Sequence, residues 1–301
     1  MTTIMIAIIM SIMIKTWRHK AVFLTDIPSR FTLLKEISMS IEAKTTTILI
    51  TGASTGIGAT YADRFAKRGH NLILVARNGA RLEELATRLR KETGVTIDII
   101  VADLTKSADL AKVEARLRDD KDIGILLNNA GAAAHGGFES STADAQENLI
   151  TLNITALTRL SAAVIPRYLA QGQGAIVNIA SVVALAPELQ LGMYGATKAY
   201  VLHYSQALHV ELGARGLYVQ AVLPAATRTE IWERSGRDVN EMTGVMEVGE
   251  LVDAALVGFD RGEVITIPPL PDAAQWETFN SARQAMLPNL AQEHAAKRYQ
   301  A

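Results

Sequence analysis

The stretch ITGASTGIGATYADRFAKRG, residues 50–69, decides how this chain folds. It begins at the end of TILIT (47–51), an apolar run typical of a buried strand, and it continues with helical spacing. Gly52, Gly56 and Gly58 stand at the junction, where glycine lets the backbone turn sharply and lets an anion approach closely. The next helix would present its free N–H groups and positive dipole end there. The junction therefore predicts a phosphate-binding turn, with an ordinary tight turn as the alternative.

The rest of the chain alternates apolar runs with amphipathic stretches, which indicates an α/β fold. We expect strands at 47–51, 71–76, 96–102, 123–128, 175–180, 217–224 and 263–268, and helices at 57–68, 80–94, 107–119, 142–170, 192–215 and 248–260. Short strands separated by long helices imply parallel pairing through right-handed crossovers. Such strands are covered on both faces, which explains their continuous Val, Ile and Leu content. The pattern predicts one doubly wound, Rossmann-type domain over 45–301, including a tail after about residue 270.

Composition excludes several classes of function. The 301 residues include 30 basic and 31 acidic side chains, so no positive excess favours nucleic acid or an anionic membrane surface. With no cysteine, disulfides, thiolate zinc sites and thiol nucleophiles are excluded, and a cytoplasmic location is expected. The six histidines show no ligand spacing, so we expect no metal site.

The N-terminal segment carries an apolar run of 11 residues, IMIAIIMSIMI (4–14). A membrane-spanning helix needs about 20, and a secretory signal has its cations before the apolar run rather than after it. We expect residues 1–44 to be an extension outside the fold, with Met39 as a natural start. The alternatives are a weak membrane anchor through residues 4–14 and a packed extension.

Several motifs occur together in a fixed order. They are TGASTGIG (51–58), AD (102–103), NNAG (128–131), Asn153, Ser181 and YGATK (194–198). With these marks the chain resembles the short-chain dehydrogenase/reductase family, in its compact single-domain branch, from about Thr47 to Pro268. The resemblance implies three α/β/α layers, the sheet order 3-2-1-4-5-6-7, and a nicotinamide dinucleotide across the carboxyl edge of the sheet.

The cofactor-binding residues follow from the same marks. By resemblance they are Gly52, Ser54, Thr55, Gly56, Ile57, Gly58, Arg77, Asp103, Leu104, Asn129, Ala130, Gly131, Tyr194, Lys198, Pro224, Thr227 and Thr229. Arg77 stands where an NAD-binding chain has a carboxylate, and a guanidinium is a good partner for a phosphate. We therefore expect NADP(H) in preference to NAD(H), unless Arg77 only pairs with Glu83 or Glu84.

Three further residues have implied roles that are less specific. Asp103 would bind the adenine amino group or cap the following turn. Asn128 would tie neighbouring strands together. His135 could reach a substrate, although a surface loop is its more ordinary place.

The catalytic candidates are Ser181, Tyr194, Lys198 and Asn153. Tyr194 and Lys198 are four residues apart on an expected helix, so they share a face. A free phenol has a pKa near 10, and we expect the ammonium and the cofactor's nicotinamide ring to lower it. Ser181, after the fifth strand, would hold the substrate oxygen beside the phenol. The resemblance implies that Asn153, at a local bend, holds a water that links Lys198 to solvent.

The sequence thus predicts an NADP(H)-dependent oxidoreductase that interconverts a ketone or aldehyde with an alcohol. Substrate identity is expected to lie in segments 183–193 and 225–246, whose apolar residues suggest an uncharged or hydrophobic substrate. Helices 142–170 and 192–215 resemble those through which relatives form dimers or tetramers. The sequence departs from the family at Ala225, which replaces a glycine, and in a C-terminal end without the usual glycines.

Two other classes of function remain as alternatives. A non-catalytic NADP(H) sensor would need the glycine turn but not the catalytic residues. An extended-branch epimerase or dehydratase would usually show T-G-x-x-G-x-x-G and a larger C-terminal domain.

Overall fold

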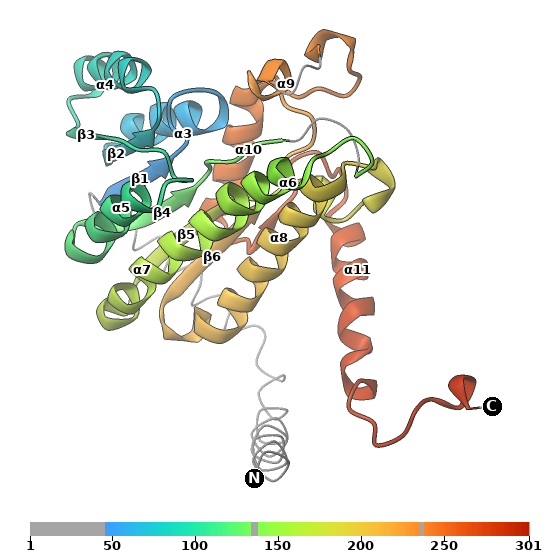
Figure 1. Ribbon diagram of the computed structural model, residues 1–301. Helices are drawn as coiled ribbons and strands as arrows, with labels where there is room; N and C mark the ends of the chain where they lie inside the picture. Colours follow the sequence, from blue (N-terminus) through green and yellow to red (C-terminus); the bar gives the residue numbers. More distant parts are fainter. Residues whose placement is uncertain (1–45, 134–137, 235–237, 301) are drawn as a thin grey trace.

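A sheet of seven parallel strands forms the centre of the computed structural model, which describes residues 46–133, 138–234 and 238–300 (Figure 1). The strand order is β3-β2-β1-β4-β5-β6-β7, as predicted. The strands are β1 (Thr47–Thr51), β2 (Asn71–Ala76), β3 (Ile97–Val101), β4 (Ile123–Asn128), β5 (Gly174–Ile179), β6 (Leu217–Val222) and β7 (Ile265–Thr266).

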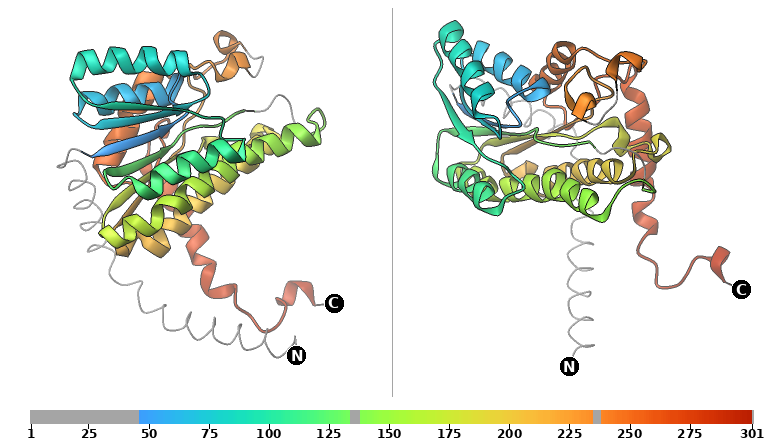
Figure 2. Two further views of the ribbon diagram at one scale, coloured as in Figure 1. Left: turned by 60° about the vertical axis from the view of Figure 1, so that its left-hand side comes forward. Right: turned by 45° about the horizontal axis from the view of Figure 1, so that its top comes forward.

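Helices cover both faces of the sheet, so the three predicted layers are confirmed (Figure 2). One face carries α3 (Gly56–Lys67), α4 (Gly79–Thr93) and α10 (Val248–Asp260). The other carries α5 (Ser107–Asp119), α7 (Leu157–Gln171) and α8 (Gly192–Leu212). The short helices α6 (Ala143–Ile150) and α9 (Ile231–Arg234) lie near the carboxyl edge, and α11 (Ala273–Ala285) follows β7.

The core explains why the strands are apolar along their whole length. In β1, Ile48 and Ile50 join the hydrophobic cluster under α3, α4 and α10, whereas Leu49 joins the cluster under α5, α7 and α8. Successive side chains of a strand point to opposite faces, so a sheet that is covered twice must be apolar at every position. All three side chains are fully buried.

The structure differs from the predicted elements in three places. The single helix predicted at 142–170 is α6 and α7 joined by a π-helical segment, Thr151–Ala156, which hydrophobic spacing does not reveal. The last strand is two residues long rather than six. The predicted tail contains α11, whose side chains are mostly exposed and therefore give little apolar pattern.

Some predictions fall outside the described residues, namely the extension 1–44, its apolar run 4–14, the start at Met39, and His135. The joined helix Ala143–Gln171 is long and apolar enough to cross a membrane. It packs against α5 and the sheet, however, so its apolar side chains serve the core.

Candidate active site

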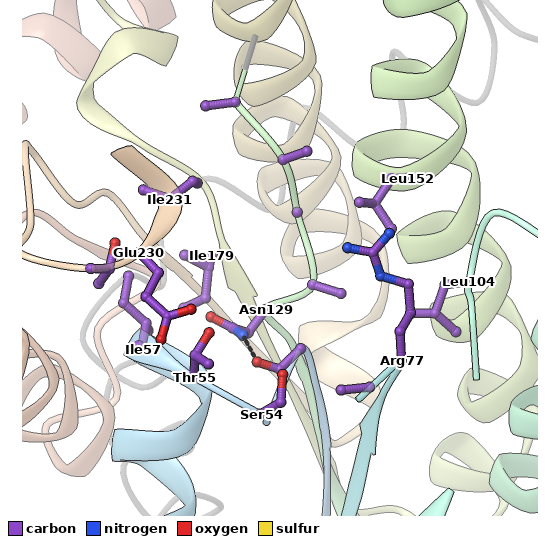
Figure 3. A pocket seen from close by; sticks show the side chains of 18 of the residues that line it. Ser54, Thr55, Ile57, Arg77, Leu104, Asn129, Leu152, Ile179, Glu230 and Ile231 are labelled. Atoms are coloured by element: carbon purple, nitrogen blue, oxygen red, sulfur yellow. Dashed lines mark hydrogen bonds between the residues drawn. The ribbon is translucent and has the colours of Figure 1, made fainter. Parts of the chain in front are cut away.

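A cavity of about 850 Å³ lies at the carboxyl ends of the strands, where an open α/β sheet binds its ligands (Figure 3). Of the predicted cofactor residues, those that line it are Gly52, Ser54, Thr55, Gly56, Ile57, Arg77, Asp103, Leu104, Asn129, Ala130, Gly131, Tyr194, Lys198, Pro224, Thr227 and Thr229. Ser181 lines it too, and so does Ala225. Gly58 and Asn153 do not line the cavity; both lie behind the residues that do.

The glycine turn is fastened to the end of β4. Asn129 Nδ2 donates to Thr51 O at 2.9 Å and to Gly52 O at 3.1 Å. Thr51 Oγ1 accepts from the backbone N–H groups of Asn129 and Ala130, each at 3.0 Å. A Cβ on Gly58 would collide with Gly52 O and would lie 2.5 Å from Asn129 Nδ2. Gly58 therefore keeps α3 close to the turn rather than contacting a ligand.

Arg77 is an exposed side chain on the cavity wall (Figure 3). Glu83 pairs with Arg90 at 2.9 Å, so the alternative in which Arg77 pairs with Glu83 is wrong. Across the described ranges, Arg77 forms no hydrogen bond or ion pair with Glu84 or any other side chain. Its positive charge contributes to a lowered pKa of Asp103, an effect due first to the hydrogen bond from Thr105.

Asp103 both lines the cavity and closes the next turn. Its Oδ1 accepts from the N–H of Thr105 at 3.1 Å and from the Thr105 hydroxyl at 2.7 Å. The capping alternative is therefore realised, and the side chain still borders the space where an adenine would lie.

Ser181, Tyr194 and Lys198 meet at the opposite end of the cavity. Ser181 Oγ donates to Pro224 O at 3.1 Å and accepts from Val183 N at 3.4 Å, and its hydroxyl is close enough to the Tyr194 phenol to act on the phenol pKa. Lys198 Nζ donates to Ile179 O at 2.8 Å and lies 5.7 Å from the centroid of the Tyr194 ring. These contacts bring β5, the loop after β6 and the first two turns of α8 together around one phenol.

Burial dominates the protonation of this group. It raises the pKa of Tyr194 to about 12, and the hydrogen bond with Ser181 acts in the opposite direction. It lowers the pKa of Lys198 to about 8. Burial therefore sets the phenol pKa in this structure, and the Lys198 ammonium is held at the Ile179 carbonyl. The lowering expected from Lys198 together with the nicotinamide ring of the cofactor stays a prediction.

Asn153 lies in the π-helical segment, which is the bend that the resemblance implied. Its Oδ1 accepts from Ala132 N at 2.9 Å, and its Nδ2 donates to Ala132 O at 3.0 Å and to Thr197 Oγ1 at 3.0 Å. Thr197 Oγ1 in turn donates to Tyr194 O at 2.8 Å. The side chain thus holds the loop after β4 against the helix that carries the phenol.

Asn128 ties neighbouring elements together, as the resemblance implied. Its Nδ2 donates to Asn178 Oδ1 at 3.0 Å and to Ser161 Oγ at 3.1 Å. Asn178 Nδ2 donates to Ser205 Oγ at 2.9 Å. This buried polar chain joins β4 and β5 to α7 and α8 below the cavity.

Sequence reasoning missed three contributors to the site. Arg81 and Glu230 both line the cavity and form an ion pair of 2.7 Å, although 149 positions separate them. Thr197, fully buried, connects Asn153 to α8. The spacing of four between Arg77 and Arg81 was a usable signal, but nothing local indicates the other two. Within the described parts of the chain, no three His, Asp or Glu side chains are grouped so that they could hold a metal ion.

Comparison with known families and structures agrees with this arrangement. The short chain dehydrogenase family profile matches residues 46–240. A short-chain dehydrogenase from Sphingobium yanoikuyae in complex with NADPH is 63% identical, with a TM-score of 0.84, covering 85% of this chain and 100% of that one. The bulky-bulky ketone specific alcohol dehydrogenase from Comamonas testosteroni is 57% identical, with a TM-score of 0.80, covering 85% and 99%.

Curated relatives are more distant. The human inactive hydroxysteroid dehydrogenase-like protein 1 is 35% identical over 185 residues, which cover 61% of this chain. The alignment spans 56% of the length of that relative, and the same share of its chicken counterpart.

Proposed function

The chain belongs to the short-chain dehydrogenase family, and from that premise we propose that it is an NADP(H)-dependent oxidoreductase that interconverts a ketone or aldehyde with an alcohol. One observation carries the proposal. The Ser181 and Tyr194 hydroxyls and the Lys198 ammonium converge in the same cavity as the glycine turn and Arg77.

The residues around the cavity fit a phosphorylated dinucleotide. The turn at Gly52 brings bare backbone to the cavity wall, and Arg77 offers a guanidinium that no acid of the described chain binds. At the other end, Gly131 lies beside the catalytic group; a Cβ there would lie 3.3 Å from Asn153 Oδ1 and at an ordinary contact distance of 3.6 Å from Lys198 Nζ. When bound, the cofactor supplies a hydride to the carbonyl carbon or accepts one from the alcohol.

The side chains at the reacting end control the proton that moves when the hydride is transferred. With a pKa of about 12, Tyr194 is protonated at neutral pH, which is the form that donates a proton to the oxygen of a reduced carbonyl. Ser181 orients that oxygen through its own hydroxyl. Lys198, with a pKa of about 8, carries its charge at neutral pH, and it would bind the nicotinamide ribose. Asn153 positions α8 through Thr197.

We propose an uncharged, bulky ketone as the substrate class. Leu191, Ile231 and Trp232 line the cavity in the two segments that border its reacting end. These large apolar side chains, next to the hydroxyls of Thr227 and Thr229, favour binding of an uncharged molecule. The name of the Comamonas neighbour, which describes a bulky-bulky ketone specific enzyme, supports the same class.

The test is a turnover assay that follows NADPH absorbance with a panel of small and bulky ketones and aldehydes. Wild type is expected to consume NADPH with bulky ketones. Tyr194→Phe should lose about 10³-fold in turnover, within the range that general acid catalysis contributes. It should retain NADPH binding because the ring remains. Turnover that survives the substitution would refute the assigned proton donor.

A non-catalytic NADP(H)-binding sensor is the second candidate, favoured by the name of the human relative, which describes that protein as inactive. The complete set of Ser181, Tyr194, Lys198 and Asn153 argues against it for this chain. Tight NADPH binding without turnover on any panel member would favour the sensor.

We also propose that the chain forms a homodimer or homotetramer through α7 and α8. In support, Val210 on α8 leaves 77% of its surface exposed, an unusual state for a large aliphatic side chain. Light scattering of the purified chain would measure the assembly, and a monomer at micromolar concentration would contradict it.

A further inference from the structure

An ion pair connects two sides of the cofactor cavity. Arg81 is the third residue of α4, after β2, and Glu230 precedes α9, after β6. Arg81 Nη1 donates to Glu230 Oε1 at 3.0 Å and to Oε2 at 2.7 Å. Both residues line the cavity, and Figure 3 shows the Glu230 carboxylate directed toward Thr55, on the side of the glycine turn.

This pair is easily exchanged for another partner. The Arg81 and Glu230 side chains are 44% and 39% exposed, and ion pairs between such groups contribute little stability because water screens them. Arg81 uses one guanidinium nitrogen for Glu230, whereas a guanidinium offers five N–H donors in a planar fork. A phosphate matches that fork and carries more charge than a carboxylate.

The position of Arg81 indicates which phosphate it would meet. Arg77 immediately precedes Asn78, which caps α4 by accepting from Arg81 N at 3.1 Å. The two arginines therefore flank the first turn of the helix, both line the cavity, and Figure 3 shows Arg77 beside Leu104. Leu104 and Asp103 border the part of the cavity proposed for the adenosine half of the cofactor.

We propose that Arg81 is a second reader of the NADP(H) 2′-phosphate, and that it exchanges Glu230 for that phosphate when the cofactor binds. The inference rests on the proposed function and adds a residue that sets cofactor specificity. The exchange of partners would also affect the part of the cavity proposed for the substrate. Glu230 belongs to the segment that includes Ile231 and Trp232, and the base of that segment is closed by the Thr227–Met246 bridge.

Binding measurements on the full chain test the exchange without relying on activity. NADPH and NADH are titrated separately, by cofactor fluorescence, into wild type, Arg81→Gln and Glu230→Gln. Arg81→Gln should weaken NADPH binding about 10-fold, since a charge-assisted hydrogen bond is lost, and should change NADH binding less than about 2-fold. Glu230→Gln should tighten NADPH binding about 2-fold to 5-fold, since it removes a weak competing pair.

Arg90→Gln is the matched control. Arg90 is on the same helix, is 40% exposed and pairs with Glu83 at 2.9 Å, but it lies outside the cavity. It should leave both affinities unchanged. Arg81→Lys should restore part of the NADPH affinity, because it keeps the charge but not the fork. Thermal unfolding of each variant confirms that the fold is intact.

The outcomes separate this inference from the proposed function. Equal losses of NADPH and NADH affinity in Arg81→Gln would overturn the assignment to the 2′-phosphate. Unchanged NADPH affinity in that variant would overturn any role for Arg81 in binding. Failure of wild type to bind either cofactor would overturn the proposed function itself, and this inference with it.

Discussion

The glycine turn and the tyrosine site lie at two ends of one cavity, but backbone atoms form the first and side chains form the second. At the turn, backbone atoms form the surface, and the side chains around it mainly hold the backbone in place, as Asn129 holds Thr51 and Gly52. At the tyrosine, buried side chains from different elements support one phenol, and Lys198 and Thr197 are almost fully enclosed.

Because of this difference, the two ends of the cavity should tolerate different substitutions. Ligand binding at a surface made of backbone atoms depends on the shape of that surface, so an added Cβ methyl group is the change most expected to disrupt binding there. A cluster of buried polar groups depends on charge and hydrogen bonding, so its variants should change pH behaviour and chemistry while leaving the shape of the cavity intact. The four predictions below test this contrast.

The largest effect is expected from Lys198→Met, at the reacting end. Replacing the ammonium by an apolar group of similar length should lower turnover about 10³-fold, because a proton-transfer arrangement is lost. The free energy of unfolding should stay the same or rise, since the buried charge disappears. Steady-state kinetics and urea denaturation measure the two effects. A variant that loses stability and keeps its turnover would contradict the contrast.

Gly58→Ala should harm the phosphate end by shape alone. The new Cβ would meet Gly52 O and Asn129 Nδ2, neither of which can move without disturbing the turn. We expect a loss of about 3 kcal/mol in stability, at the upper end for overpacking, with weaker NADPH binding. Gly249→Ala is the control, because its Cβ would meet only the flexible end of Arg64. Equal stability of the two variants would argue against a close turn.

Stability should depend on pH through Lys198. Its pKa is about 8 in the folded chain and near 10.5 when unfolded, so between these values the unfolded chain binds more protons. The free energy of unfolding should therefore rise by about 2 kcal/mol from pH 7.5 to 9.5 relative to Lys198→Met. Above pH 10 the raised pKa of Tyr194 acts in the opposite direction. Urea titrations of both proteins at several pH values measure the difference, and parallel curves would refute the assignment.

Thr197→Val should have the smallest effect. It removes the hydroxyl between Asn153 Nδ2 and Tyr194 O and should cost about 1 kcal/mol, with a turnover loss of a few-fold. Thr278→Val is the matched control. Thr278 Oγ1 makes a similar bond to Ala274 O on the exposed helix α11. Equal decreases in the melting temperatures of Thr197→Val and Thr278→Val would show that the hydrogen bond from Asn153 to Thr197 adds no stability.

Much of the fold was predictable because its signals are local. Strand runs such as 71–76 and 123–128 match the observed strands residue for residue, and Gly94 ends α4 in a left-handed conformation, as a capping glycine should. The glycine spacing and the Tyr194–Lys198 spacing placed both ends of the cavity for the same reason.

The remaining features depend on contacts that no local pattern encodes. The ion pair of Arg81 and Glu230 joins distant parts of the chain, and the pKa of Tyr194 follows from how completely the fold encloses it. The length of β7 depends on pairing with β6 at the edge of the sheet rather than on its own apolar run.

The π-helical segment makes this region more sensitive to length than to composition. A π turn holds more residues than an α turn, so deleting one residue between Thr151 and Ala156 would allow a continuous α-helix. Because the π turn absorbs its extra residue within a single turn, this deletion would leave the faces of α6 and α7 in register and would remove only the local displacement of the backbone around Asn153. Asn153 would then lose the position from which it bonds to Ala132 and Thr197, and a chain with every named side chain still present would have lost the connection between the loop after β4 and α8.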